Sequence, residues 1–192
     1  VIQIVDLATV LLVNPAVTAK PVAELIALAK AQPGKLNYAS AGFGSVNHLA
    51  AELFDYEAGI NVVHVPYQGG GPSIAALVAG DVQMEFITLP PSLPFIKDGR
   101  VRALGVSSAK RQPVLPDVPT LQEAGFKDFD VTYWNCLFGP AGLPAPGCTT
   151  RPAGLSTTIT SRSSQAIESG MFSAAGASTT TYIKGQLQEV AA

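Results

Sequence analysis

The stretch LNYASAGFGSVNHLAAELF, residues 36–54, holds a complete strand–turn–helix unit. Residues 36–39 are typical of a short buried strand, and residues 40–45 form a turn that contains two glycines. After the turn, apolar residues recur at i, i+3, i+4, i+7 and i+8 from Val46, which is the stripe of an amphipathic helix. The stretch therefore predicts a strand that leads through a tight turn into a helix.

The same alternation continues on both sides of this unit. Upstream, residues 1–13 predict a strand, and Pro21 stands where a helix favours proline in its first turn. Downstream, the predicted elements are strands at 62–65, 83–87, 101–106 and 131–138, helices at 72–80 and 89–96, and a short helix that a Thr120–Glu123 capping box opens and Gly125 ends. Alternating strands and helices predict an α/β fold with a largely parallel sheet.

Composition excludes several classes of protein. The 192 residues are 47% hydrophobic, so the chain is not disordered, and two cysteines cannot staple a fold of this length. A net charge of −2 without a basic run argues against nucleic-acid binding. The sequence has no apolar run long enough to span a membrane, and no signal peptide is visible.

Ligands of such sheets bind beyond the carboxyl ends of the strands, in the turns that lead into helices. Residues 40–45 occupy such a turn: its glycines let a ligand approach the backbone, and the following helix presents free N–H groups and a positive dipole end. This combination predicts a site for a carboxylate or phosphate. A tight turn in which Ser45 merely caps the helix is the alternative. Neither a Walker loop nor a GxGxxG fingerprint is present.

The second glycine loop, at residues 66–71, offers backbone amides but no side-chain chemistry, so it is either a ligand loop or a connector. Tyr67 lines a cleft or fills one. Trp134, in a predicted strand, packs in the core or stands at a cleft or hinge.

Few residues form a pattern that indicates catalysis. His48 is expected to be a hydrogen-bonded packing residue in a helix, and His64 a residue of a strand. Glu52 and Asp55 lie three residues apart on one helix, as on a solvated face. No GxSxG or HExxH motif and no metal-ligand cluster occurs, so we expect no metal, no cofactor and no enzyme activity. Cys136 and Cys148 are interpreted as isolated thiols, and a disulfide between them stays open.

Nine stretches, taken together in this order and spacing, resemble a known family. They are VNP (13–15), VAELIALAK (22–30), PGKLNYAS (33–40), GFGS (42–45), HLA (48–50), VPYQG (65–69), LGVSSAKR (104–111), LPDVPT (115–120) and EAG (123–125). The chain resembles the tripartite tricarboxylate transporter solute-binding proteins, the TctC or Bug family of extracytoplasmic receptors.

The resemblance implies a type II periplasmic-binding-protein fold, with two α/β lobes around a cleft. On this basis residues 15–130 form the second lobe, residues 1–14 are a crossover strand and remnant of the first lobe, and residues 131–192 return to that first lobe. It also implies a periplasmic monomer that binds a small di- or tricarboxylate and hands it to a membrane permease. The candidate ligand-binding residues are Ser40, Ala41, Gly42, Phe43, Gly44, Ser45, Tyr67, Gly69, Thr88 and Trp134.

The chain departs from the family pattern in two ways. Where members carry an acid after the fourth strand, as in FDNLP, this chain has Phe86-Ile87-Thr88-Leu89-Pro90, which favours a plain carboxylate over an amino acid as ligand. The family's leading segment has no counterpart before Val1, and the Ser/Thr-rich residues 149–181 do not match its charged helix, so we expect a partial chain.

Two alternative functions remain at this point. The first is an α/β enzyme that binds a phosphorylated substrate at the Ser40–Ser45 loop. The second is a protein-interaction module without a small ligand.

Overall fold

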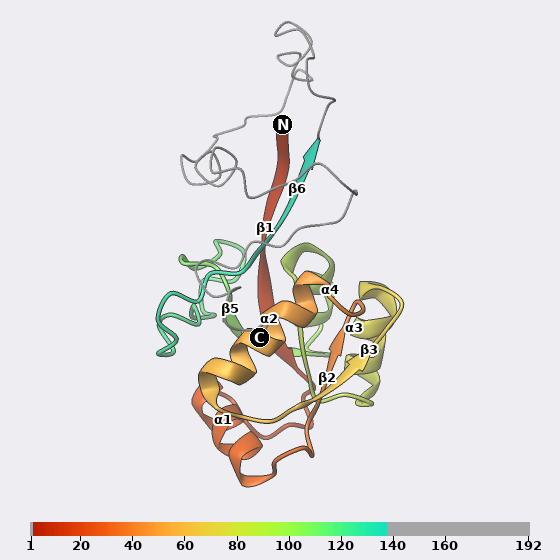
Figure 1. The fold of residues 1–192 in the computed structure, drawn as a ribbon, viewed down its shortest axis with the longest axis vertical. Coiled ribbons are helices and arrows are strands. Elements are labelled where there is room, and N and C mark those ends of the chain that lie inside the picture. Colours follow the sequence, from red (N-terminus) through yellow and green to blue (C-terminus); the bar gives the residue numbers. More distant parts are fainter. Residues whose placement is uncertain (1, 138–192) are drawn as a thin grey trace, which may run out of the picture. The chain divides into compact units, whose positions relative to one another are not determined.

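The computed structural model describes residues 2–137 (Figure 1). The elements in chain order are β1 (Ile2–Val13), α1 (Val22–Ala31), β2 (Asn37–Ser40), α2 (Val46–Ala58), β3 (Val63–Pro66), α3 (Gly70–Ala79), β4 (Met84–Thr88), α4 (Leu89–Lys97), β5 (Arg102–Val106) and β6 (Thr132–Leu137). The alternation of strand and helix predicted from the sequence is therefore confirmed from β1 to β5.

The strands form one mixed sheet in the order β3-β2-β4-β1-β5, and β6 also pairs with β1. β2 runs parallel to both β3 and β4, because a helix crosses over between successive strands. β1 runs antiparallel to both of its neighbours, β4 and β5. The expectation of a largely parallel sheet is thus wrong at its centre, because the β4–α4–β5 crossover passes over β1 and leaves room for a strand of opposite direction.

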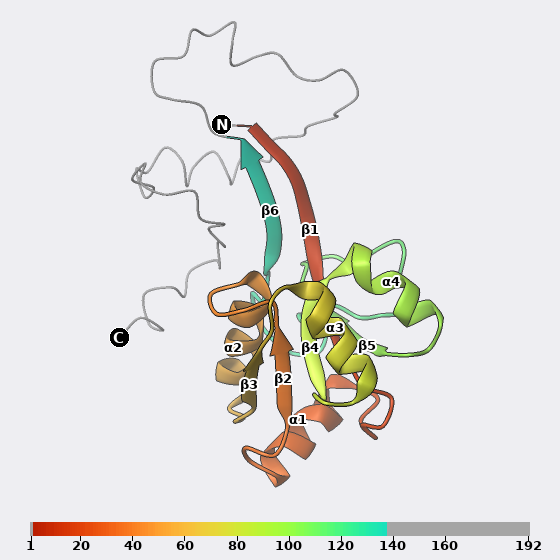
Figure 2. The ribbon, with the colours of Figure 1, turned by 90° about the vertical axis from the view of Figure 1, so that its right-hand side faces the viewer.

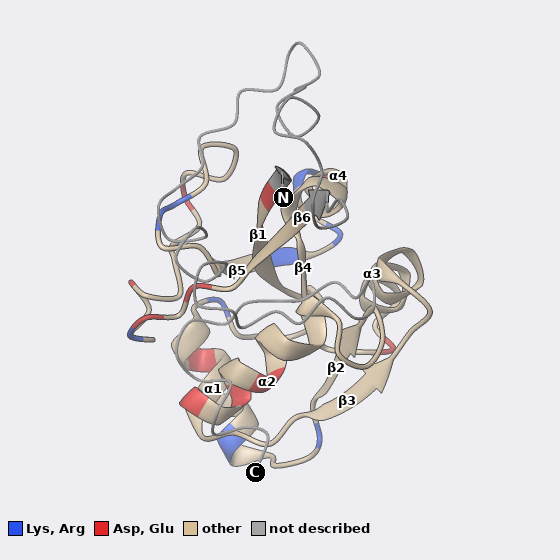
Figure 3. Ribbon diagram, turned by 45° about the horizontal axis from the view of Figure 1, so that its top comes forward, with Lys and Arg blue, Asp and Glu red and all other residues tan. Residues whose placement is uncertain are grey.

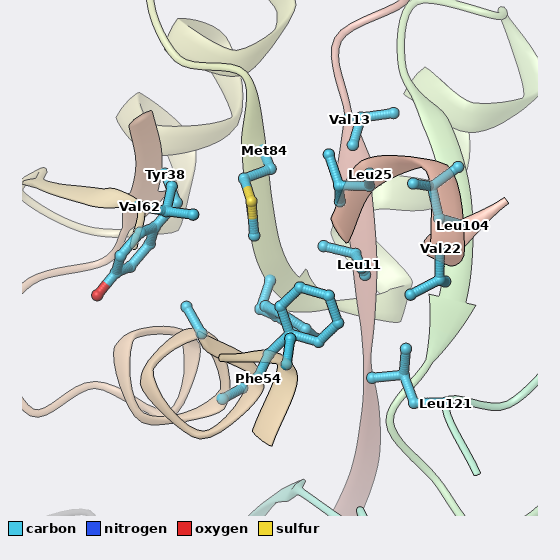
Figure 4. Packing of buried hydrophobic residues seen from close by; sticks show 14 of the residues in the cluster. Leu11, Val13, Val22, Leu25, Tyr38, Phe54, Val62, Met84, Leu104 and Leu121 are labelled. Atoms are coloured by element: carbon cyan, nitrogen blue, oxygen red, sulfur yellow. The ribbon is translucent and has the colours of Figure 1, made fainter. Parts of the chain in front are cut away.

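Helices cover both faces of this sheet, as Figure 2 shows. Leu11 and Val13 of β1 belong to a core cluster that includes residues of α1 and α2, whereas Val10 and Leu12 belong to a second cluster with residues of α3 and α4. Side chains of a strand point alternately to opposite faces, so β1 supplies both cores. Figure 4 shows the first cluster, in which Phe54 of α2 packs beside the strands.

Some boundaries differ from prediction. α3 begins at Gly70, two residues before Pro72, which therefore sits inside the first turn. The capping box forms as predicted: the N–H of Thr120 donates to Glu123 and the N–H of Glu123 donates to the Thr120 hydroxyl. No helix follows it, however, because residues 121–125 form successive turns that end at Gly125.

The chain divides into two compact units. Among the described residues, 7–133 belong to one unit, and 2–6 and 134–137 to the other. The predicted domain limits at residues 14 and 131 stay predictions, and the predicted C-terminal helices and Cys148 lie outside the described residues. In the described part of the chain, no helix has the length and apolar character that a membrane crossing requires.

Candidate functional site

Three strand-to-helix junctions lie at one edge of the sheet. β2, β3 and β4 run in the same direction, and each leads at its carboxyl end into a helix: α2 begins at Val46, α3 at Gly70 and α4 at Leu89. The first N–H groups of a helix have no partner inside the helix and carry the positive end of its dipole. This edge therefore gathers positive backbone potential, and neither residues 40–48 nor residues 66–73 include a charged side chain.

The first loop is held by serine hydroxyls. The Ser45 hydroxyl accepts from the N–H of His48, which makes Ser45 the N-cap of α2 as predicted, and it donates to the Gly42 carbonyl at 2.7 Å. The N–H of Gly42 donates to the Ser40 hydroxyl oxygen at 3.1 Å. Gly42 has a φ of 122°, and Gly44 a φ of 72°, in the left-handed region that favours glycine.

Two histidines pack beneath this loop. The N–H of Gly44 donates to Nδ1 of His48 at 3.3 Å, and Nε2 of His64 lies 2.6 Å from the Ser40 hydroxyl oxygen. The two imidazole rings lie against each other, with 4.2 Å between their centroids. The expected roles of a packing histidine and a strand histidine are both confirmed, but their mutual contact is new.

Aromatic rings enclose the histidine pair. Tyr38 stacks on His64 at 4.8 Å, and the edge of Phe43 meets both imidazoles. The Tyr38 hydroxyl donates to Glu52, and burial, followed by Glu52, raises the pKa of Tyr38 well above its ordinary value. Phe43 stands at the tip of the loop with 80% of its surface exposed.

The second loop contacts the first but is built differently. The N–H of Tyr67 donates to the carbonyl of Ser40 at 3.0 Å, so the two loops are joined. Gly69, with a φ of 107°, is the N-cap of α3 and offers no side chain to cap it. Tyr67 is half-buried, and its ring packs against the second core cluster.

A buried carboxyl lies under the second loop. Glu85 of β4 has no exposed surface, and one of its oxygens lies 2.5 Å from the Ser73 hydroxyl, while the other, Oε2, has no hydrogen-bond partner in the described part of the chain. Ser73 also donates to the Gly70 carbonyl at 3.0 Å. Burial raises the pKa of Glu85 to about 8, and the bond from Ser73 lowers it only in part.

The structure brings together nine of the ten predicted ligand-binding residues at this edge, as members of the two loops and as Thr88. Thr88 is half-buried and is the N-cap residue of α4. Trp134 lies in β6, which confirms its strand, and belongs to the other compact unit. The ligand-binding role of all ten residues stays a prediction.

Asp55 differs from its expected place on a solvated face. Its Oδ2 accepts from the N–H of Val62, and its Oδ1 is buried without a partner among residues 2–137. Burial raises its pKa to about 7. Figure 3 shows acidic residues on both α1 and α2. The sequence signal was ambiguous because Glu52, one turn earlier, is exposed. Among described residues, no three His, Cys, Asp or Glu side chains group as metal ligands.

A family model described as the tripartite tricarboxylate transporter family receptor, TctC, matches residues 1–159. The chain belongs to this family. The TctC family consists of binding proteins rather than enzymes, so the alternative of an α/β enzyme is not supported. The predicted resemblance is thereby confirmed, together with a periplasmic-binding-protein fold of which this chain matches about half.

Relatives of this TctC chain include a curated protein and two solved structures. The "UPF0065 protein in tcbD-tcbE intergenic region" of Pseudomonas sp. (strain P51) is 41% identical over 145 residues, which are 75% of this chain and 43% of that protein. R. palustris Rpa4515 with adipate is 35% identical with a TM-score of 0.71, over 76% of this chain and 49% of that one. MatC from Rhodopseudomonas palustris with bound malate is 33% identical with a TM-score of 0.70, over 76% and 50%. The chain thus spans less than half the length of the curated protein and about half of the two structures.

Proposed function

We propose that this TctC-family protein is a periplasmic solute receptor that binds a small di- or tricarboxylate and delivers it to the membrane permease of a tripartite transporter. The loop of residues 40–45 contacts one carboxylate of the ligand, and the loop of residues 67–69 and Thr88 line the same site. Two relatives were solved with adipate and malate, which are both dicarboxylates, and this supports the choice of ligand class.

One observation carries the proposal: the starts of α2, α3 and α4 meet at a single sheet edge that has no charged side chain in its two glycine loops. Backbone N–H groups and helix dipoles stabilise an anion without a fixed counter-charge. Such a site suits a carboxylate that must be bound and later released.

The residues after β4 indicate whether the ligand carries an ammonium group beside its carboxylates. Residues 87–90, Ile-Thr-Leu-Pro, offer no acidic side chain to pair with an ammonium group. We therefore propose a plain carboxylate rather than an amino acid. Titration calorimetry is expected to show tighter binding of succinate, adipate or malate than of aspartate or glutamate, and the reverse order overturns this part.

A glycine pair tests the location of the site. Gly44 has a φ of 72° and Gly34 a φ of 70°, and an added Cβ meets nothing within 4 Å at either position. Both Gly→Ala changes therefore impose a similar backbone strain, but Gly44 follows β2 in the candidate loop, whereas Gly34 precedes β2 at the opposite end. In the protein as its gene encodes it, Gly44→Ala is expected to weaken adipate or malate binding at least tenfold, and Gly34→Ala to leave it unchanged.

The outcomes separate the alternatives. Equal effects of the two changes overturn the location, and failure of all carboxylates to bind overturns the function. Inorganic phosphate and a phosphate monoester serve as controls, because binding of these in preference to carboxylates favours a phosphorylated ligand.

A further inference from the structure

The candidate loop has its amides already engaged by side chains. Gly42 donates to the Ser40 hydroxyl, and Gly44 donates to Nδ1 of His48. The ligand-contacting role of this loop, on which this inference rests, requires that an arriving carboxylate obtain N–H groups from the same backbone. The bond from Gly44 to His48 is the one that a ligand can replace, because Gly44 is exposed whereas Ser40 is fully buried.

The geometry determines which ring nitrogen of neutral His48 carries the proton when no ligand is bound. Nδ1 of His48 accepts a hydrogen bond, so in the neutral ring the proton is on Nε2, which lies 3.8 Å from Oε1 of Glu52. A proton added at Nδ1 turns that acceptor into a donor. Two donors cannot bond each other, so protonation releases the N–H of Gly44 and aims two N–H groups at one place.

We propose that His48 is a ligand-binding residue whose protonation accompanies carboxylate binding. A carboxylate oxygen replaces Nδ1 as the acceptor of the Gly44 N–H. His48 takes up one proton at Nδ1, and the new N–H donates a hydrogen bond to the same oxygen. The proton comes from solvent and stays on His48, so the ligand keeps its charge. The site thereby gains a positive charge beside the loop.

One acid and two aromatic rings surround the imidazole of His48. Glu52, on the next turn of α2, lies 3.8 Å from Nε2 of His48, and Phe43 makes a T-shaped contact with the imidazole. Tyr38, from β2, stacks at 6.4 Å and stays neutral. Glu52 can therefore pair with an imidazolium, and neither aromatic ring adds a competing positive charge.

His64, from β3, completes the set of titratable groups that face His48. Burial and the neighbouring His48 lower the pKa of His64. Its Nε2 can donate to the Ser40 hydroxyl, which then donates to the Gly42 carbonyl, so the neutral ring satisfies the network. Two imidazolium ions with centroids 4.2 Å apart repel each other, and therefore the pair takes up one proton and not two.

Calorimetry in two buffers of different ionisation enthalpy measures this proton directly. The protein as its gene encodes it is titrated with adipate, and with malate, between pH 6.5 and 8, where both ligands are fully ionised. We expect a net uptake of protons on binding, and an affinity that falls as pH rises by up to about tenfold per unit, which is the limit for one coupled proton.

Two matched variants locate the proton. His48→Gln keeps an oxygen acceptor for Gly44 but cannot gain a proton, so it is expected to bind with no uptake and a flat pH profile. His64→Gln removes the partner imidazole and is expected to retain the uptake. Long-range nitrogen NMR of the wild-type protein tests the same point without a variant. The nitrogen chemical shifts of His48 should show that Nδ1 becomes protonated when adipate is added.

The outcomes also separate this inference from the proposed function. Binding without proton uptake, or uptake that persists in His48→Gln, overturns the role of His48 and leaves the receptor function standing. If no carboxylate binds at all, the proposed function fails, and the role of His48 fails with it.

Discussion

The two glycine loops at the candidate site both lead from a strand into a helix, but different contacts hold them in place. In the first loop, side chains satisfy the backbone: Ser40 and Ser45 hydroxyls hold Gly42, and Ser45 caps α2. In the second, Gly69 leaves the start of α3 without a side-chain cap, and the polar side chains of Ser73 and Glu85 lie buried beneath it. The first loop is thus held by partly buried hydrogen bonds of serine hydroxyls, and the second lies over a buried carboxyl that has one oxygen without a partner among the described residues.

This comparison predicts that the largest change in stability lies under the second loop. Glu85 has its pKa raised from 4.5 to about 8, so the folded protein holds a proton there that the unfolded chain releases. The folded state is therefore penalised as pH rises from about 4.5 to about 8, by roughly 1.4 kcal/mol per unit. Glu85→Met, of similar length and without the charge, is expected to raise the free energy of unfolding at pH 7 by about 3 kcal/mol.

Urea denaturation between pH 5 and 8 measures this effect. The wild-type free energy of unfolding should fall across this range, and Glu85→Met should flatten the fall. Asp55, whose pKa is raised to about 7, contributes a slope of the same sign that remains in the variant and that Asp55→Asn removes. An unchanged slope in Glu85→Met contradicts a protonated Glu85.

The sequence predicts the scaffold of both loops better than their interiors. Hydrophobic spacing located α2 and the strands because it is a local property, and Ser45 was identified as a cap because it stands directly before the helix. The direction of a strand relative to its neighbours is not a local property. The apolar sequence of β1 does not indicate that it lies between β4 and β5 and runs antiparallel to both. The packing of His48 against His64 and the burial of Glu85 beside Ser73 were missed for the same reason, since each contact joins different elements.

A smaller effect is expected at Ser73, which is the one hydrogen-bond partner of Glu85 among the described residues. Ser73→Ala removes a hydroxyl that bonds both Glu85 and the Gly70 carbonyl and leaves a buried carboxyl with no partner, which should lower the free energy of unfolding by about 2 kcal/mol. The double variant with Glu85→Met tests the cause. If the carboxyl is responsible, most of the loss disappears in that background, whereas full additivity shows that Ser73 acts independently.

The smallest effect is expected in the first loop. Ser45→Ala deletes the N-cap of α2 and the bond to Gly42, and should lower the free energy of unfolding by about 1 kcal/mol. Thermal unfolding of Ser45→Ala beside Ser45→Asp, which restores a capping oxygen, measures it. A loss in Ser45→Ala that exceeds that of Ser73→Ala reverses the order of the two loops and contradicts the comparison.

The placement of β1 also has a kinetic consequence. Among the described elements β1 comes before the others, yet the N–H of Thr9 bonds the Ser107 hydroxyl 98 residues later, and β1 lies between β4 and β5. The loop closures that seat it are long, and contacts of high sequence separation form slowly. The local units of β2, α2, β3 and α3 can therefore assemble while the sheet centre is still open. During synthesis, β1 therefore leaves the ribosome before β4 and β5, the two strands between which it lies.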